Sequence, residues 1–247
     1  MDGKGEYKLM SHTYLRTFGL ALCLTAFAGC ASAPTKPAGP PPPQNLLGAT
    51  DELQLVTELS LNLASEYGGD HILVVLEIDG TLLTMQPGQD ENPCSSTTDS
   101  ATIHMQPAQA DAAELVRRIQ AAGMNVIVLT SRAPDCRLQT FADLDSNGFD
   151  FTATAWPPRA GYPEPFMPKG GGRPVLYENG VFFADGQDKG VMLKALLEKT
   201  SDPQPILIVM ADRSKDSLNA VMKTFSWSGT KVHAWRYTRE QIVAPGP

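Results

Sequence analysis

The chain has no block of basic residues and no interleaving of basic with aromatic side chains. Its 20 lysine and arginine residues are outnumbered by 27 aspartates and glutamates, and the formal net charge is −7. Proteins that bind nucleic acid concentrate positive charge on one face, so nucleic acid is not an expected partner. The excess of acidic residues favours solubility and identifies no partner by itself.

Long apolar runs are also missing. The run from Phe18 to Cys30 is shorter than the ~20 residues that a transmembrane helix needs. Three basic residues precede it, and a basic segment followed by a short apolar one is typical of a secretory signal. Its end, Phe27-Ala-Gly-Cys30, resembles a bacterial lipobox, in which small residues precede a cysteine that becomes lipidated. We therefore expect a lipoprotein signal peptide over residues 1–29 and a lipid on Cys30. The alternatives are simple secretion and a short buried helix.

Proline gathers in the segment that follows, with six residues between Ala31 and Asn45. This composition gives an extended spacer that cannot build a packed core, although proline-rich ligand segments look similar. We expect a tether over residues 30–47 and a single domain over 48–247, because 247 residues suit one domain better than two. The lipid would hold this domain in the bacterial cell envelope, on the outer membrane and facing the periplasm.

Only four cysteines occur in the chain. Cys23 lies in the expected signal peptide and Cys30 is the expected lipid site, which leaves Cys94 and Cys136. An exported compartment permits disulfides, so these two are expected to pair with each other. Two free thiols are the alternative.

Apolar strands alternate with helical patterns through the rest of the chain. This order predicts an α/β fold, with a mainly parallel, Rossmann-like sheet that has helices on both faces. The expected helices cover 51–67, with Asp51 as N-cap, 108–122, 134–146, 189–199 and 214–225, and the expected strands cover 72–78, 125–129, 206–210 and 231–235. A hairpin is predicted at Glu178-Asn-Gly180. The polar stretches 85–105 and 149–172 are expected to be inserts without regular structure.

Polar residues follow three of the predicted strands, and a lysine begins one of the helices. These residues are Glu77, Asp79, Thr130, Lys189, Asp212 and Asp216. The carboxyl ends of parallel strands meet at one edge of a sheet, where open α/β folds bind ligands, so these side chains are expected to lie close together. The period of two along a strand would place Glu77 and Asp79 on the same side, where both could face one phosphate or one metal ion.

The order and spacing of these residues resemble the haloacid dehalogenase (HAD) superfamily, whose members are mostly magnesium-dependent phosphatases. Its first motif is an apolar strand followed by Asp-x-Asp-x-Thr, which here stands as Glu77-Ile-Asp79-Gly-Thr81. Thr130 at the end of a strand matches the second motif and Lys189 the third, while Asp212 with Asp216 matches the fourth. The resemblance covers roughly residues 72–237. The chain looks most like the exported lipoproteins of this superfamily, which are acid phosphatase-like or uncharacterised.

The resemblance implies a role for each of these residues. Position 77 would be the nucleophile, and Asp79 would protonate the leaving oxygen and then activate water. Thr130 and Lys189 would hold the phosphate of a small phosphorylated substrate. Mg²⁺, which prefers oxygen ligands, would be bound by Glu77, Asp79 and Asp212, with Asp216 orienting either the shell around it or Lys189.

Position 77 departs from the family, because it is glutamate where the family has aspartate. The extra methylene moves the carboxylate outward by about one C–C bond, ~1.5 Å. Where in-line geometry is required, a shift of that order can cost about 10²-fold in rate. Two functions therefore stay open: a membrane-tethered phosphatase, or a catalytically impaired binding or scaffold lipoprotein of the envelope.

Overall fold

The computed structural model describes residues 40–86, 94, 105–200 and 203–239. The expected signal peptide, the expected lipid site at Cys30 and most of the expected tether lie outside the described residues. Within the described part of the chain, no helix is long and apolar enough to cross a membrane.

A seven-stranded sheet with the order β1-β9-β8-β2-β5-β7-β6 forms the centre of the fold. Its pairs are parallel except for β6 with β7, which form an antiparallel hairpin. The strands are β1 (Leu46–Thr50), β2 (Ile72–Leu76), β5 (Asn125–Thr130), β6 (Leu176–Glu178), β7 (Val181–Phe183), β8 (Leu207–Asp212) and β9 (Lys231–Tyr237). A separate two-stranded sheet pairs β3 (Leu83–Met85) with β4 (Met105–Pro107). The predicted α/β fold with a mainly parallel sheet is confirmed.

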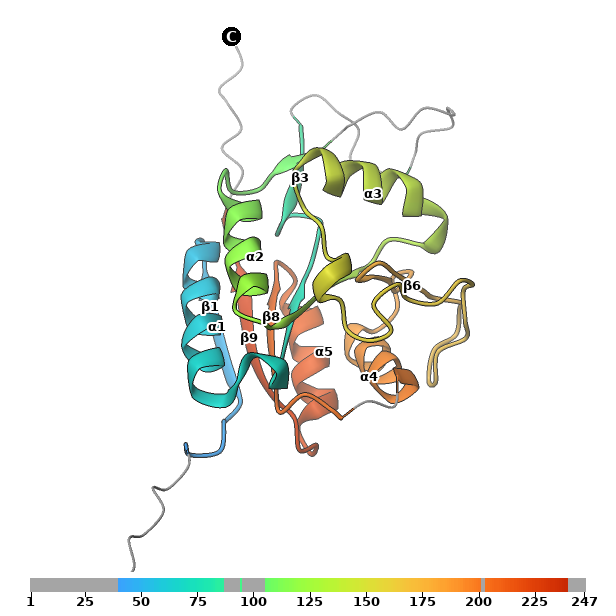
Figure 1. Ribbon diagram of the computed structural model, residues 1–247. Coiled ribbons are helices and arrows are strands. Elements are labelled where there is room, and N and C mark those ends of the chain that lie inside the picture. Colours follow the sequence, from blue (N-terminus) through green and yellow to red (C-terminus); the bar gives the residue numbers. More distant parts are fainter. Residues whose placement is uncertain (1–39, 87–93, 95–104, 201–202, 240–247) are drawn as a thin grey trace, which may run out of the picture. The chain divides into compact units, whose positions relative to one another are not determined.

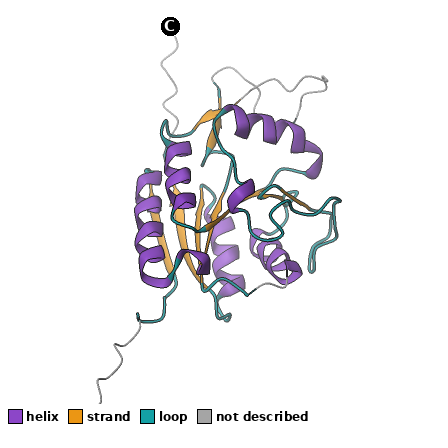
Figure 2. Cartoon of the chain, viewed as in Figure 1, coloured by secondary structure: helices purple, strands orange, loops and turns teal. Residues whose placement is uncertain are grey.

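Helices cover both faces of the sheet (Figures 1 and 2). The apolar side chains of α1 (Leu53–Tyr67) and α2 (Ala112–Ala121) pack in one core cluster, together with Val74 of β2. Those of α4 (Lys189–Thr200) and α5 (Lys215–Phe225) pack in the other cluster, with Leu73 and Val75. Alternate residues of β2 thus face opposite layers, and the strand reads as a continuous apolar run because both its faces are buried. The remaining helices are α3 (Arg137–Ser146) and the 3₁₀ turns η1 (Gly69–His71), η2 (Pro134–Cys136) and η3 (Thr152–Thr154).

Several element boundaries differ from those predicted. The helix expected from residue 51 begins at Leu53, and the residue in the N-cap position is Glu52, whose side chain makes no capping bond. The helix expected from residue 108 begins at Ala112, and residues 105–107, within and just after the stretch expected to lack regular structure, form strand β4. The strand expected to reach residue 78 ends at Leu76.

Strand β1 was not predicted, and it begins inside the segment expected to be a tether. It pairs in parallel with β9 along its whole length, from Leu46 with His233 to Thr50 with Tyr237. That partner explains why β9 continues to Tyr237, beyond the expected end at residue 235. Leu46 and Leu47 stay 40% and 47% exposed, so β1 lacks the buried apolar pattern by which a strand is recognised.

Two local predictions concern turns and cysteines. The hairpin is confirmed: Asn179 and Gly180 both have positive φ, 48° and 82°, as a type I′ turn requires. A disulfide joins Cys94 to Cys136, with the two Cα atoms 5.3 Å apart. It connects the polar insert to η2, just beyond the carboxyl end of β5.

Candidate active site

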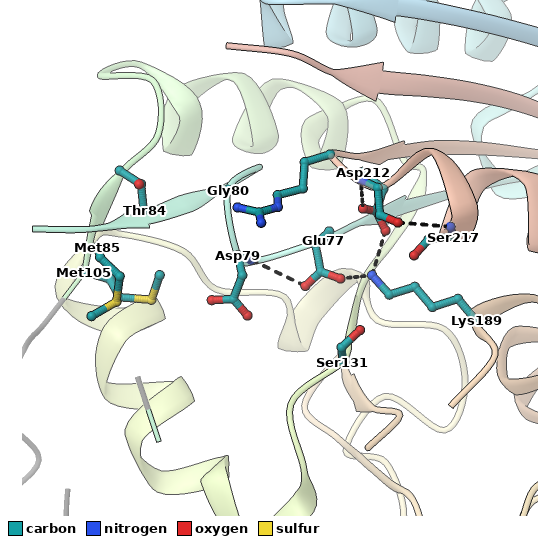
Figure 3. Close-up of a pocket in the computed structure, with 12 residues that line it drawn as sticks. Glu77, Asp79, Gly80, Thr84, Met85, Met105, Ser131, Lys189, Asp212 and Ser217 are labelled. Atoms are coloured by element: carbon teal, nitrogen blue, oxygen red, sulfur yellow. Dashed lines mark hydrogen bonds and ion pairs between the residues drawn. The ribbon is translucent and has the colours of Figure 1, made fainter. Parts of the chain in front are cut away.

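A cavity of about 400 Å³ lies at the carboxyl ends of β2, β5 and β8 (Figure 3). This size is within the ~300–1,000 Å³ range of small-molecule pockets. The residues that line it are Glu77, Asp79, Gly80, Thr84, Met85, Met105, Ser131, Lys189, Asp212, Arg213, Ser214 and Ser217. The predicted strand-end residues Glu77, Asp79 and Asp212 therefore meet at one edge of the sheet, and Lys189 at the start of a helix joins them as expected.

Lys189 lies between two carboxylates at the base of this cavity. Its Nζ donates a hydrogen bond to Oδ2 of Asp212 at 2.6 Å and forms an ion pair with Oε2 of Glu77. The side chains of Lys189, Glu77 and Asp212 are only 3%, 6% and 1% exposed. Burial lowers the pKa of Lys189, and the neighbouring Asp212 carboxylate acts in the opposite direction. Two carboxylates around one ammonium make this buried cluster an anionic site with a fixed cation inside it.

The register of the sheet explains why Glu77 and Asp212 are neighbours. Leu76 of β2 is paired with Ala211 of β8, so the next residue of each strand lies side by side at the sheet edge. The backbone N–H of Glu77 donates to the Ala211 carbonyl at 3.1 Å, which continues the pairing by one residue. Oδ1 of Asp212 then accepts the backbone N–H of Ser214 at 2.7 Å, which fixes the second carboxylate.

Close helix packing brings Lys189 to the same point. Lys189 is the first residue of α4, and Gly190 lies directly against α5. A Cβ at Gly190 would overlap the backbone carbonyl oxygen of Ala220, so only glycine allows the two helices to approach this closely. The pair Lys189-Gly190 therefore combines a charged group for the site with the residue that lets its helix reach the site.

Asp79 takes a different partner from Glu77. Because the strand ends at Leu76, the period of two does not extend to these residues, and within the protein the two acids take different partners. Both still line the same cavity. Arg132 binds both oxygens of Asp79, with Nη2 at 2.8 Å from Oδ1 and Nε at 3.1 Å from Oδ2. The Asp79 side chain is still 39% exposed, so it lies at the open side of the cavity.

Arg132 is not among the site residues predicted from the sequence, although it binds one of them. Its side chain is 3% exposed, and its Nη1 also donates to Thr140 Oγ1 at 2.9 Å and lies 3.5 Å from Oδ2 of the fully buried Asp143. The one feature of the sequence that could have identified Arg132 is its position, two residues after the end of β5. A buried arginine beyond a strand end, in a fold that binds ligands there, is a candidate for pairing with a site carboxylate.

Thr130 and Asp216 do not line the cavity. Thr130 is buried, and its Oγ1 accepts the backbone N–H of Arg132 at 3.2 Å, while the next residue, Ser131, faces the cavity. Asp216 is exposed in the first turn of α5. Its predicted role in orienting a metal shell has no support from its position.

The oxygen donors at the site suit a hard cation such as Mg²⁺. The carboxylates of Glu77 and Asp212 approach the same Nζ, and a carboxylate oxygen keeps a lone pair for a cation after accepting one hydrogen bond. Among the described residues, no group of three or more His, Cys, Asp or Glu side chains is arranged as a metal site. A cation held here would therefore use two protein carboxylates and fill its other positions with backbone oxygen, water or substrate.

The comparisons with known proteins give one finding. A family model described as "Protein of unknown function (DUF2608)" matches residues 95–244, a stretch that contains Arg132, Lys189 and Asp212 but not Glu77 or Asp79. No curated protein and no solved structure matches the chain.

Proposed function

This chain belongs to the DUF2608 family of proteins of unknown function, and from the chemistry of its site we propose a Mg²⁺-dependent phosphohydrolase of the HAD-like type. Its substrate would be a small phosphorylated molecule. The observation that carries the proposal is the contact of Lys189 with both Glu77 and Asp212 at the carboxyl ends of two neighbouring parallel strands. A carboxylate nucleophile and a cation for phosphate oxygens are both requirements of phosphoryl transfer.

Each residue then has a defined chemical task. An oxygen of Glu77 forms a bond to phosphorus as the bond from phosphorus to the leaving oxygen breaks, and Asp79 gives the leaving oxygen its proton. Asp79 then takes a proton from the water that releases phosphate from Glu77. It can do so while bound to Arg132, because each carboxylate oxygen has a second lone pair. Lys189 and the Ser131 hydroxyl bind the phosphate oxygens.

Glu77 and Asp212 are the side chains that would hold Mg²⁺, together with the Asp79 backbone carbonyl implied by the family resemblance. Bound Mg²⁺ would offset the charge of the phosphate and of the two acids. Since Lys189 alone supplies one positive charge against these two carboxylates, a dianionic phosphate would otherwise add to an existing negative excess.

The length of Glu77 is partly absorbed by its conformation. Its Oε1 accepts the backbone N–H of Ile78 at 2.8 Å and lies 3.4 Å from the backbone nitrogen of Asp79. The side chain thus folds back toward its own backbone and does not extend fully into the cavity. This fold-back offsets some of the ~1.5 Å by which a glutamate carboxylate extends beyond an aspartate carboxylate.

One observation favours the second candidate function, an envelope binding or scaffold protein. All four carboxylate oxygens of Glu77 and Asp212 already have a protein donor, and both oxygens of Asp79 are held by Arg132. A fully paired centre can bind an anion without reacting with it. Turnover separates the two functions, since both allow ligand binding.

Phosphoester turnover tests the proposal. We expect purified protein to hydrolyse at least one member of a broad phosphoester panel in Mg²⁺, and to lose that activity in excess EDTA. The Glu77→Asp variant is the informative comparison, because it restores the usual nucleophile while keeping the charge. No turnover by the wild type, together with turnover by Glu77→Asp, would show that the natural chain has lost the reaction.

We also propose that the protein is a lipoprotein of the bacterial outer membrane, facing the periplasm, with its lipid on Cys30. Cells that express the wild type and are fed a labelled fatty acid are expected to incorporate the label into the protein. Cys30→Ser should abolish this labelling, because the acceptor thiol is gone. Cys23→Ser, seven residues earlier, is the matched control and should stay labelled. Label that persists in Cys30→Ser would contradict the assignment.

A further inference from the structure

A second cavity, of about 950 Å³, adjoins the first. Gly80, Arg213 and Ser214 line both cavities, so the two lie next to each other along this edge of the sheet. The second cavity is formed where β8 and β9 end and α5 begins. Its lining contains four basic side chains, and we call this cavity the basic groove: Arg213, Lys215, Arg236 and Arg239.

The positive charge of the basic groove is largely uncompensated. Arg239 is paired with Glu52 at 3.0 Å, but Arg213, Lys215 and Arg236 have no acidic partner among residues 40–86, 94, 105–200 and 203–239. Among the described residues, the side chains of these three make one hydrogen bond, from Nε of Arg236 to the Arg213 carbonyl oxygen at 3.4 Å. In a chain with a net charge of −7, three unpaired cations in one concave surface are not a consequence of composition. Their mutual repulsion favours an anionic ligand there.

The backbone adds to this preference. Ser214 caps α5, with its side chain accepting the N–H of Ser217 at 3.2 Å, and Lys215 is the first residue of the helix. The N-terminal end of a helix carries partial positive charge and free N–H groups, which favour phosphate and carboxylate. Three sources of positive potential therefore converge at the groove: the loop after β8, the start of α5 and the end of β9.

Gly80 stands at the junction of the two cavities. Its φ is +73°, and a Cβ there would overlap Cδ of Arg213. The absence of a side chain lets Arg213 lie directly against the backbone of the Glu77-to-Thr81 segment. Arg213 is consequently shared by the catalytic cavity and the basic groove, where it can reach an anion that spans both.

We propose that the substrate is a small organic bisphosphate. Its reacting phosphate occupies the cavity at Glu77 and Lys189, its second phosphate occupies the basic groove, and the part between them passes Gly80. This inference rests on the proposed function and extends it to a substrate class. Charge-assisted contacts to Lys215 and Arg236 would supply affinity that a monophosphate cannot gain.

The test compares one bisphosphate with its two monophosphates. With the full-length protein in detergent and Mg²⁺, kcat and KM are measured for fructose 1,6-bisphosphate, fructose 1-phosphate and fructose 6-phosphate. We expect kcat/KM for the bisphosphate to exceed that of either monophosphate by about tenfold or more, an effect of the size expected for charge-assisted contacts. Lys215→Ala/Arg236→Ala should remove this advantage and leave the monophosphate rates unchanged.

A matched control exists at the opposite ends of the same two elements. Lys223, in the last turn of α5, and Lys231, at the start of β9, line neither cavity. The variant Lys223→Ala/Lys231→Ala removes the same charge and should keep the bisphosphate preference. An equal loss in both double variants, or no preference in the wild type, would overturn the inference.

Equilibrium binding separates this inference from the proposed function. Calorimetric titration of the three sugar phosphates into the wild type and both double variants measures affinity without requiring turnover. Bisphosphate that binds at least about tenfold more tightly than the monophosphates, yet is not hydrolysed, would support the groove and contradict the phosphohydrolase. Hydrolysis of the monophosphates with equal binding of all three sugars would contradict the groove and support the phosphohydrolase.

Discussion

Replacing Lys189 with methionine is expected to abolish phosphoester turnover and to lower the free energy of unfolding by about 3–5 kcal/mol. The substitution keeps most of the apolar stem but leaves Glu77 and Asp212, which are 6% and 1% exposed, without their shared cation. Two buried carboxylates would then repel each other with no positive charge between them. The loss of stability should be smaller at pH 5 than at pH 8, because protonation of one carboxylate relieves the repulsion.

Denaturant unfolding at the two pH values measures this effect. Lys194→Met is the matched control, since Lys194 lies on the same helix but is 46% exposed and pairs with Glu198 on the surface. It should change stability by no more than about 1 kcal/mol. If Lys189→Met does not fold, Lys189→Met/Glu77→Gln should recover folded protein by removing one buried charge. A Lys189→Met protein as stable as the control at pH 8 would contradict the buried ion cluster.

Replacing Arg132 with methionine is expected to have an effect of similar size, about 3–5 kcal/mol, through a separate pair of acids. Arg132 is 3% exposed and lies against Asp143, which is fully buried, as well as against Asp79 in the cavity. Arg132 is a positioning residue, because it holds both oxygens of Asp79 in one orientation. Its removal should therefore lower kcat much more than it changes KM, since proton transfer by Asp79 needs that orientation.

The Arg132→Lys variant separates the loss of stability from the loss of kcat. Lysine keeps the charge but cannot bind a carboxylate through two parallel hydrogen bonds, so much of the stability should return while kcat stays low. Arg117→Met is the control for loss of a surface arginine, because Arg117 is 58% exposed and pairs with Glu114, which is also exposed. Wild-type kcat in Arg132→Lys would show that Asp79 does not depend on this orientation.

The fold and the centre of the site follow from features that a sequence displays directly. Continuous apolar runs identify β2, β5 and β8 as buried parallel strands, and the polar residues after them must then meet at one edge. Glu77 and Asp212 are expected together on that basis, Lys189 is added by its match to the family motif, and the contacts of the three residues agree. The register of the sheet makes Glu77 and Asp212 neighbours, since Leu76 and Ala211 pair and each precedes a site acid.

The parts that could not be predicted depend on pairing between distant segments. Arg132 finds Asp79 across 53 residues, and nothing in its local sequence specifies that partner. Strand β1 has no buried face and is defined by the edge of β9, far along the chain. Thr130 and Asp216 are predicted from motif position alone. The Thr130 hydroxyl instead accepts a backbone hydrogen bond in the turn after β5, and Asp216 is exposed on α5.

Turnover by the wild type and by Asp79→Asn tests the central claim most directly. Asparagine keeps the shape of the side chain but cannot transfer the proton, so on the phosphoester panel we expect Mg²⁺-dependent hydrolysis by the wild type and a loss of at least about 10²-fold in Asp79→Asn. Wild-type protein that binds phosphoesters but hydrolyses none of them, or hydrolysis that is unchanged in Asp79→Asn, would contradict a phosphohydrolase at this site.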